Sequence, residues 1–188
     1  MRIEAEERHG TVREGYQLLL RAHAELLLPT ELLKIRDFYD RLCNVFMTWA
    51  MEVHGEKLKK EFSELETVRE KSCFRPQSYH FRMRVPWKDE QYAVFLCESV
   101  LKGQWSEIPN SYHRISHVWN IEEQTVLPFS QILQVFGVKI KKDMFPFRPD
   151  GIYPDEGGLV IFRNATQTSP FAEKIFADMG HLDGKTDK

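Results

Sequence analysis

The sequence predicts an α+β fold in which an antiparallel β-sheet is covered on one face by a long N-terminal amphipathic helix, a second helix and a short later helix. Three observations predict it. Apolar residues recur at three- and four-residue steps after residue 30, they alternate with polar residues in several other segments, and short turns join those segments. A helix with a broad apolar stripe must bury it, so we expect the helices on one side of the sheet.

The first regular element is predicted from Leu20 to Leu28. Every second residue there is apolar and polar residues lie between most of them, which is typical of a half-buried strand. A helix is the alternative, because four apolar residues also share a helical face: Leu18, Leu19, Ala22 and Leu26. Pro29 ends either element.

A helix follows from about Ile35 to Val53 and gives the strongest signal in the chain. Its apolar stripe consists of Ile35, Phe38, Tyr39, Leu42, Val45, Phe46, Trp49, Ala50 and Val53. Thr30 is a suitable N-cap, Glu31 suits the positive end of the helix dipole, and Gly55 is a natural break. A second, more polar helix is expected with a buried line of Leu58, Phe62, Leu65 and Val68.

The rest of the chain is predicted to be mostly strands. Period-2 patterns or short β-prone runs place them at Tyr79–Val85, Gln91–Leu101, Tyr112–Ile121, Val126–Leu127 and Leu159–Phe162. Ser130 can cap a short helix that ends at Gly137. The segment MFPFRPDGIYPDEGG, rich in proline and glycine, is expected to form turns.

The length of 188 residues fits one domain, which we place at residues 11–180 between a flexible N-terminus at 1–10 and a flexible tail at 181–188. The first residues show no secretory pattern. The longest uncharged apolar stretch, from Cys43 to Met51, is about half of the roughly 20 residues that a membrane helix needs. We therefore expect a cytoplasmic chain, or the mature or truncated form of an exported one.

Charge and cysteine content argue against several classes of partner. The net charge of −2 and the pI near 6.4 give no field that favours nucleic acid or membrane insertion. Cys43, Cys73 and Cys97 form neither a CxxC pair nor a zinc spacing, so we interpret them as buried or inert thiols. No cofactor and no metal ion is expected.

Two polar groups could be taken for metal sites. His113 and His117 share a face of a predicted strand but lie roughly 13 Å apart at about 3.3 Å per residue, so we expect solvent-facing or cross-strand histidines. Asp150, Asp155 and Glu156 match no EF-hand, and a solvated turn explains them. No catalytic residue is predicted, because the sequence has no nucleophile elbow, phosphate loop or dinucleotide fingerprint.

The predicted ligand-binding residues lie in two irregular segments, because loops on a rigid scaffold often carry recognition. They are Trp105, Thr166, Gln167, Thr168, Ser169, Pro170 and Phe171. The alternative is that Trp105 and Phe171 only cap the core. We expect Trp49, Trp119 and the Phe residues of the long helix to be core.

Three segments in a fixed order carry a resemblance to a known family. They read IRDFYDRLCNVFMTWA, then PQSYHFRMRVPWKDEQYAVFLCESVLKG followed by ISHVWNIEEQTVLPFSQIL, and finally DGIYPDEGGLVIFRNATQTSPFAEKIF. They resemble the opening helix, the core strands and the closing strand and loop of a bacterial family of unknown function that includes the sensor domain of the anti-sigma factor RsiV and is also seen beside the peptidoglycan deacetylase PdaC. The resemblance implies an α+β fold and a non-enzymatic role at the cell envelope, which in RsiV is recognition of host lysozyme.

These observations predict a non-catalytic binding or sensor-type domain of bacterial origin. Its partner is expected to be another protein or a cell-envelope component, and its oligomeric state stays open. Two alternatives are a hydrolase with an unrecognised site and a structural component of a cytoplasmic assembly.

Overall fold

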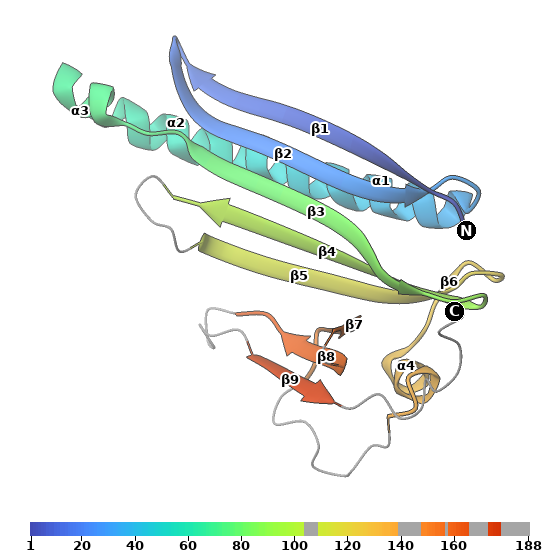
Figure 1. Cartoon of the computed structure of the whole chain (residues 1–188). Coiled ribbons are helices and arrows are strands. Elements are labelled where there is room, and N and C mark those ends of the chain that lie inside the picture. Colours follow the sequence, from blue (N-terminus) through green and yellow to red (C-terminus); the bar gives the residue numbers. More distant parts are fainter. Residues whose placement is uncertain (104–108, 139–147, 157, 166–172, 178–188) are drawn as a thin grey trace. The chain divides into compact units, whose positions relative to one another are not determined.

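The computed structural model describes residues 1–103, 109–138, 148–156, 158–165 and 173–177 (Figure 1). A six-stranded sheet has its strands in chain order: β1 (Ile3–Glu14), β2 (Gln17–Pro29), β3 (Gln77–Lys88), β4 (Tyr92–Lys102), β5 (Pro109–Asn120) and β6 (Thr125–Val126). A second sheet contains β7 (Gly151–Asp155), β8 (Gly158–Arg163) and β9 (Glu173–Ala177). The predicted α+β class is confirmed.

The chain divides into two compact units. The first contains Met1–Met83 with Cys97–His113, and the second contains Arg84–Leu96 with Arg114–Lys188. The single domain expected over residues 11–180 stays a prediction, and the tail at 181–188 lies outside the described residues. No helix of the described part is both long enough and apolar enough to cross a membrane.

The N-terminal residues are part of the first unit's sheet. Residues 1–10, expected to be flexible, include most of β1, which pairs antiparallel with β2 from Ile3 opposite Pro29 to Glu14 opposite Gln17. Gly15, at φ +55°, makes the turn, a conformation that glycine adopts without steric cost. The pattern from Leu20 to Leu28 is a strand, as predicted, and the helical alternative is wrong.

β2 and β3 run parallel, with Leu20 opposite Gln77 and Leu26 opposite Met83. The prediction of a wholly antiparallel sheet is therefore wrong for this pair. The helical segment between them is the reason, because parallel neighbours need a long crossover connection, usually a helix. This crossover brings β1 and β2 to the edge of the strands that follow (Figure 1).

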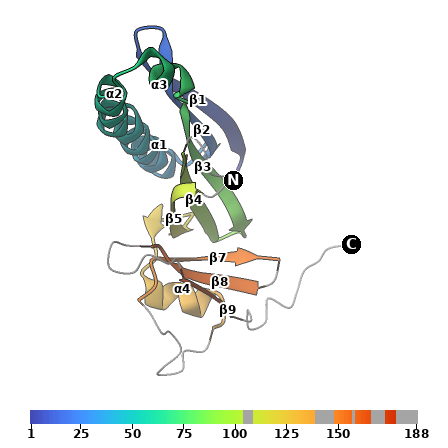
Figure 2. The same ribbon diagram turned by 90° about the vertical axis from the view of Figure 1, so that its left-hand side faces the viewer.

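The long helix extends further than predicted. α1 (Leu33–Thr48), a π-helical segment η1 (Trp49–His54) and α2 (Gly55–Ser63) follow without interruption over 31 residues and lie beside β1 and β2 (Figure 2). Gly55 does not break the helix. A Cβ at this position would lie 2.8 Å from Cγ2 of Val12, so glycine here permits the helix to approach β1 closely. Leu32, without a side-chain cap, occupies the N-cap position predicted for Thr30.

The side of this helix that is buried differs from the predicted stripe. Its buried residues are Ile35, Tyr39, Cys43, Ala50, His54, Leu58 and Phe62. Phe38, Val45, Trp49 and Val53 are instead exposed, because a helix buries only the side that meets the strands and the apolar stripe is wider than that contact. The core assignments of Trp49 and Phe38 are wrong, whereas Trp119 is buried.

Residues after Ser63 form a separate short helix, α3 (Val68–Cys73). It begins with a capping box in which the Thr67 hydroxyl accepts a hydrogen bond from the Glu70 backbone N–H. Val68 is 86% exposed. Its predicted place in a buried line is therefore wrong, because the capping box starts a new helix with a new direction.

The second unit is organised around a core that β8 supplies with Leu159, Val160, Ile161 and Phe162. α4 (Phe129–Val135) adds Ile132 and Leu133. β8 and the short helix were predicted, whereas β7 and β9 were not. β7 was missed because its Gly151 and Pro154 belong to a segment that reads as turns, yet Gly151 pairs with Phe162 and Pro154 with Leu159.

Candidate functional site

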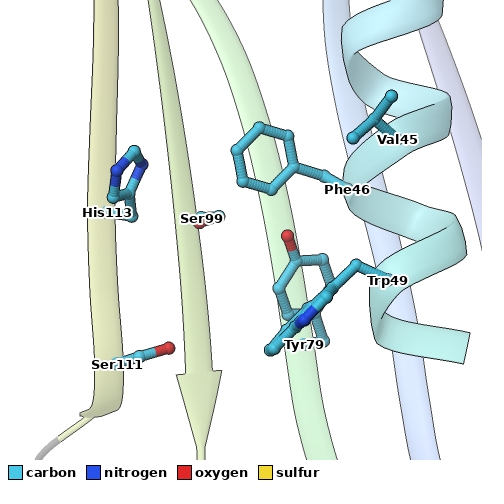
Figure 3. A pocket seen from close by; sticks show the side chains of 7 residues that line it. All are labelled: Val45, Phe46, Trp49, Tyr79, Ser99, Ser111 and His113. Carbon is cyan, nitrogen blue, oxygen red and sulfur yellow. The ribbon is translucent and has the colours of Figure 1, made fainter. Parts of the chain in front are cut away.

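The candidate site is an open pocket in the first unit, between the long helix and the sheet (Figure 3). Its volume is about 400 Å³, within the size range of small ligand sites. Three residues of the helical segment form one wall and four residues of β3, β4 and β5 form the other. They are Val45, Phe46 and Trp49, and Tyr79, Ser99, Ser111 and His113.

The aromatic wall is held by contacts with the residues behind it. The Phe46 ring lies 5.2 Å from the buried Phe81 ring and 6.2 Å from the His113 ring, centroid to centroid. Trp49 stacks on the ring of His54 at 5.6 Å and lies 5.9 Å from the Tyr79 ring. Aromatic contacts at these distances are favourable, so the wall is formed before any ligand arrives.

His54 fixes Trp49 from behind. The π-helical segment places His54 in the interior and Trp49 at the surface, and π-helical turns often occur at functional positions. His54 Nε2 and Gln77 Oε1 lie 2.9 Å apart and are hydrogen-bonded. A buried imidazole with a bonding partner is held in one orientation, so the stacked indole is also positioned.

The floor of the pocket contains a hydroxyl that lacks a regular partner. Tyr79 is 1% exposed, and its hydroxyl has no hydrogen bond of ordinary geometry with a described residue. Burial raises the pKa of this hydroxyl above its usual value, although the nearby Ser99 hydroxyl acts to lower it. It therefore stays protonated and can donate or accept a hydrogen bond.

The buried thiols close to this site are unreactive. Burial raises the pKa of Cys43 to about 11, and burial also raises the pKa of Cys97. Because the thiolate is the nucleophilic form, neither sulfur is activated at neutral pH. Cys73 is exposed, and none of the three cysteines is in a disulfide.

The residues predicted to bind a ligand are not described by the structure. Trp105 and the segment from Thr166 to Phe171 lie outside the described residues, so their role stays a prediction. The pocket residues were missed for two reasons. Val45, Phe46 and Trp49 belong to the helical stripe that was assigned to the core, and the hydroxyl residues come from strands whose approach to the helix depends on the fold.

The acidic group around Gly151 has a local role in the second unit. Asp150 accepts a hydrogen bond from the backbone N–H of Asn164 at 2.7 Å. Asp155 accepts one from the backbone N–H of Glu156 at 2.9 Å. All three acidic residues are exposed, as predicted, but only the Asp155 bond lies in a turn, because the Asp150 bond joins the start of β7 to the residue after β8.

The two histidines of β5 have different environments. His113 is exposed and lines the pocket, whereas His117 is half-buried. Burial lowers the pKa of His117 to about 4. Of the two positions expected for these histidines, solvent-facing fits His113 but not His117, and the cross-strand alternative for His117 stays a prediction.

His117 should make stability depend on pH. The unfolded chain takes up a proton near pH 6.5, whereas the folded chain does so near its folded pKa of about 4. The contribution of His117 to the free energy of unfolding is therefore fully present above pH 6.5. It falls as the pH drops towards 4, by up to about 1.4 kcal/mol per pH unit. We expect His117→Gln to flatten the change in urea midpoint between pH 7 and pH 4.5. Equal slopes in wild type and His117→Gln would contradict this.

Comparisons with known proteins give the fold. No family model matches the chain, and no curated protein matches it. A DUF3298 family structure from Bacteroides fragilis has a TM-score of 0.56 at 8% identity, over 94% of this chain and 90% of that one. A DUF3298 family structure from Pseudomonas aeruginosa has a TM-score of 0.50 at 11% identity, over 93% and 88%. The chain is thus similar in fold to proteins of this domain family of unknown function.

Proposed function

We propose that this chain is a non-catalytic binding module of the sensor type, which recognises a protein partner by taking an apolar side chain into the pocket beside Trp49. The exposed apolar surface of the helix carries this proposal: Val45 is 65% exposed and Trp49 is 40% exposed, and both line the pocket. Concentrated apolar surface next to a cavity is typical of interaction sites.

The length of the apolar surface favours a protein over a small molecule. Phe38, Val45, Trp49 and Val53 are exposed along the same helical segment. From Phe38 to Val53 the helix extends over roughly 22 Å at about 1.5 Å per residue, which exceeds the pocket. A peptide segment can contact this whole line and place one side chain in the pocket.

Polar groups in the pocket can fix the orientation of a bound peptide through hydrogen bonds. The Tyr79 hydroxyl makes no hydrogen bond of ordinary geometry to a described residue, and Ser99 and Ser111 add two more hydroxyls to the pocket. A buried donor without a partner costs free energy that a ligand can recover by accepting a hydrogen bond. An apolar side chain close to a carbonyl, as in a peptide, meets both requirements.

The sequence resemblance supports this proposal. The three segments quoted above resemble the RsiV-type sensor family, in which the implied role is recognition of a protein at the cell envelope. The two similar folds come from bacteria. The proposed sensor-type role therefore rests on the resemblance and on the pocket, and the comparisons contribute the fold.

A peptide selection with two matched valine variants tests the binding surface. Random peptides are selected on the immobilised wild-type chain and then titrated against Val45→Glu and Val68→Glu. Val68 is also an exposed helical valine but does not line the pocket. We expect the selected peptides to share an aromatic or large aliphatic residue, and their affinity to fall at least tenfold (about 1.4 kcal/mol) for Val45→Glu. Val68→Glu should bind them as the wild type does. Selected peptides that bind all three chains equally would refute the proposal.

The non-catalytic part has its own test. Ester, amide and glycoside substrates are incubated with the wild type and with His113→Ala, which removes the imidazole of the pocket. We expect no turnover above the background in either protein. Turnover that disappears in His113→Ala would identify a hydrolase, since an imidazole is the usual proton acceptor for a serine nucleophile.

A further inference from the structure

The outer face of the sheet in the first unit, away from the helix, carries a separate group of side chains. On β1, Glu6 and Arg8 face the helix, since Arg8 is hydrogen-bonded to Asp40 of α1. Successive side chains of a strand point to opposite faces. Glu7 and His9 therefore point away from the helix.

Three histidines lie side by side on that outer face. His9 of β1 pairs with His23 of β2, and His23 pairs with His80 of β3. The rings of His9 and His23 are stacked with centroids 4.5 Å apart and planes 4° from parallel. The edge of His80 meets His23 at 5.9 Å. The register of three strands thus gathers imidazoles that are far apart in the sequence.

One carboxylate faces two of these imidazoles. Glu7 Oε2 lies 3.5 Å from Nε2 of His9 and 3.8 Å from Nε2 of His23. The three ligand atoms all lie within 4.8 Å of one another. A zinc ion with bonds of about 2.1 Å in a tetrahedral arrangement keeps its ligand atoms roughly 3.4 Å apart. Small rotations of these side chains reach that geometry.

The buried nitrogen of this group, Nε2 of His23, makes no hydrogen bond to a described residue. Nδ1 of the same ring lies 3.8 Å from Glu25 Oε1. A neutral imidazole has one N–H and one lone pair. If Nδ1–H points to Glu25, the lone pair of Nε2 points towards the Glu7 carboxylate, and a cation between them removes the repulsion.

We propose that Glu7, His9 and His23 form a binding site for a divalent transition-metal ion such as Zn²⁺. Two imidazole nitrogens and one carboxylate favour zinc, copper or nickel over magnesium or calcium, which prefer all-oxygen sites. Water would complete the coordination, because the protein supplies three ligands. Glu25 takes the role of the outer carboxylate that orients a metal-bound imidazole.

The alternative is a set of surface histidines and acids without a metal, which is common on exposed sheets. Two observations argue against it here. The parallel stacking brings both Nε2 atoms to the same carboxylate oxygen, and the Nε2 of His23 is buried without a hydrogen bond to a described residue. An ordinary ion pair between mobile surface side chains requires neither a shared carboxylate oxygen nor a buried nitrogen that lacks a hydrogen bond.

Calorimetric titration of the untagged, metal-stripped chain with ZnCl₂ tests the site. We expect one Zn²⁺ per wild-type chain, and an affinity at least tenfold weaker in Glu7→Gln, His9→Gln and His23→Gln, since loss of even an outer partner commonly costs about 10- to 100-fold. His113→Gln, which removes an exposed histidine of β5, is the matched control and should bind zinc as the wild type does. Loading with Co²⁺ should give the visible absorption of a nitrogen- and oxygen-ligated ion.

The outcomes separate this site from the pocket. His9 is 67% exposed in its side chain, so His9→Gln should fold normally and remain informative. Val45→Glu should bind zinc like the wild type whether or not it binds peptides. A wild-type chain that binds no zinc, or a His9→Gln chain that binds it as tightly as the wild type, would overturn the proposal.

Discussion

Replacing Phe162 by alanine is expected to destabilise the second unit by about 3–5 kcal/mol, because it leaves a large cavity in a dense core. Phe162 is fully buried. Its ring lies 4.5 Å from the Arg114 guanidinium and 5.9 Å from the Tyr153 ring. It also fills the space beside Gly151, where an added Cβ would meet the Phe162 Cζ at 2.5 Å. Urea unfolding followed by the fluorescence of Trp87 and Trp119, in the same unit, measures the loss.

The matched control is Phe38→Ala, which removes the same side chain from an exposed position. Phe38 is 38% exposed on α1, so its loss should cost less than about 1 kcal/mol. A similar destabilisation by the two variants would contradict the assignment of Phe162 to the centre of a packed core.

Replacing Asn164 by alanine is expected to cost about 2–5 kcal/mol, because two buried backbone groups lose their partners. The Asn164 Oδ1 accepts a hydrogen bond from the Arg114 backbone N–H at 2.7 Å, and its Nδ2 donates to the Arg114 carbonyl at 2.8 Å. The Asn164 amide thus makes the two hydrogen bonds to the Arg114 backbone that a neighbouring strand would otherwise make. The same urea experiment measures the effect.

Two further variants define the role of this amide. Asn164→Asp keeps the shape but has no donor for the Arg114 carbonyl, so most of the loss should persist. Asn120→Ala removes a side chain that accepts a single exposed hydrogen bond, from the Glu123 backbone N–H, and should cost less than about 1 kcal/mol. Full stability of Asn164→Asp would show that the donated hydrogen bond contributes nothing.

The two proposed sites use opposite faces of the strands in the first unit. Tyr79 points into the pocket, whereas the next residue, His80, belongs to the histidine row. Because successive side chains of a strand point to opposite faces, the apolar pocket lies on one face and the histidines lie on the other. The zinc titration and the peptide selection therefore test independent properties of one small sheet.

Local pattern was enough to predict the strands from Leu20 to Leu28 and from Tyr79 to Val85. In both, the alternate residues are buried as expected, for example Ala22 and Ala24 in β2 and Phe81 and Met83 in β3. When apolar and polar residues alternate, one face of the strand is apolar and is buried in the core, whichever strands are its neighbours. Apolar residues at three- and four-residue steps likewise predicted the long helix.

The pocket could be predicted only in part. Val45, Phe46 and Trp49 were recognised as one apolar stripe, but periodicity does not say how much of a stripe the neighbouring strands cover. The π-helical segment at Trp49–His54 has no pattern of its own, and it decides that His54 is buried while Trp49 is exposed. His9 was placed in a flexible terminus, so its position beside His23 could not be inferred.

The sequence by itself determined the long helix, the strands from Leu20 to Leu28 and from Tyr79 to Val85, and the apolar side of those strands, because these properties depend on neighbours a few residues away. Only the tertiary structure decided that β2 and β3 run parallel, that Glu7, His9 and His23 meet, and that the helix leaves Val45 and Trp49 uncovered. Those features depend on pairing between residues far apart in the chain, and strand register and helix contact are set by the packing of the whole unit.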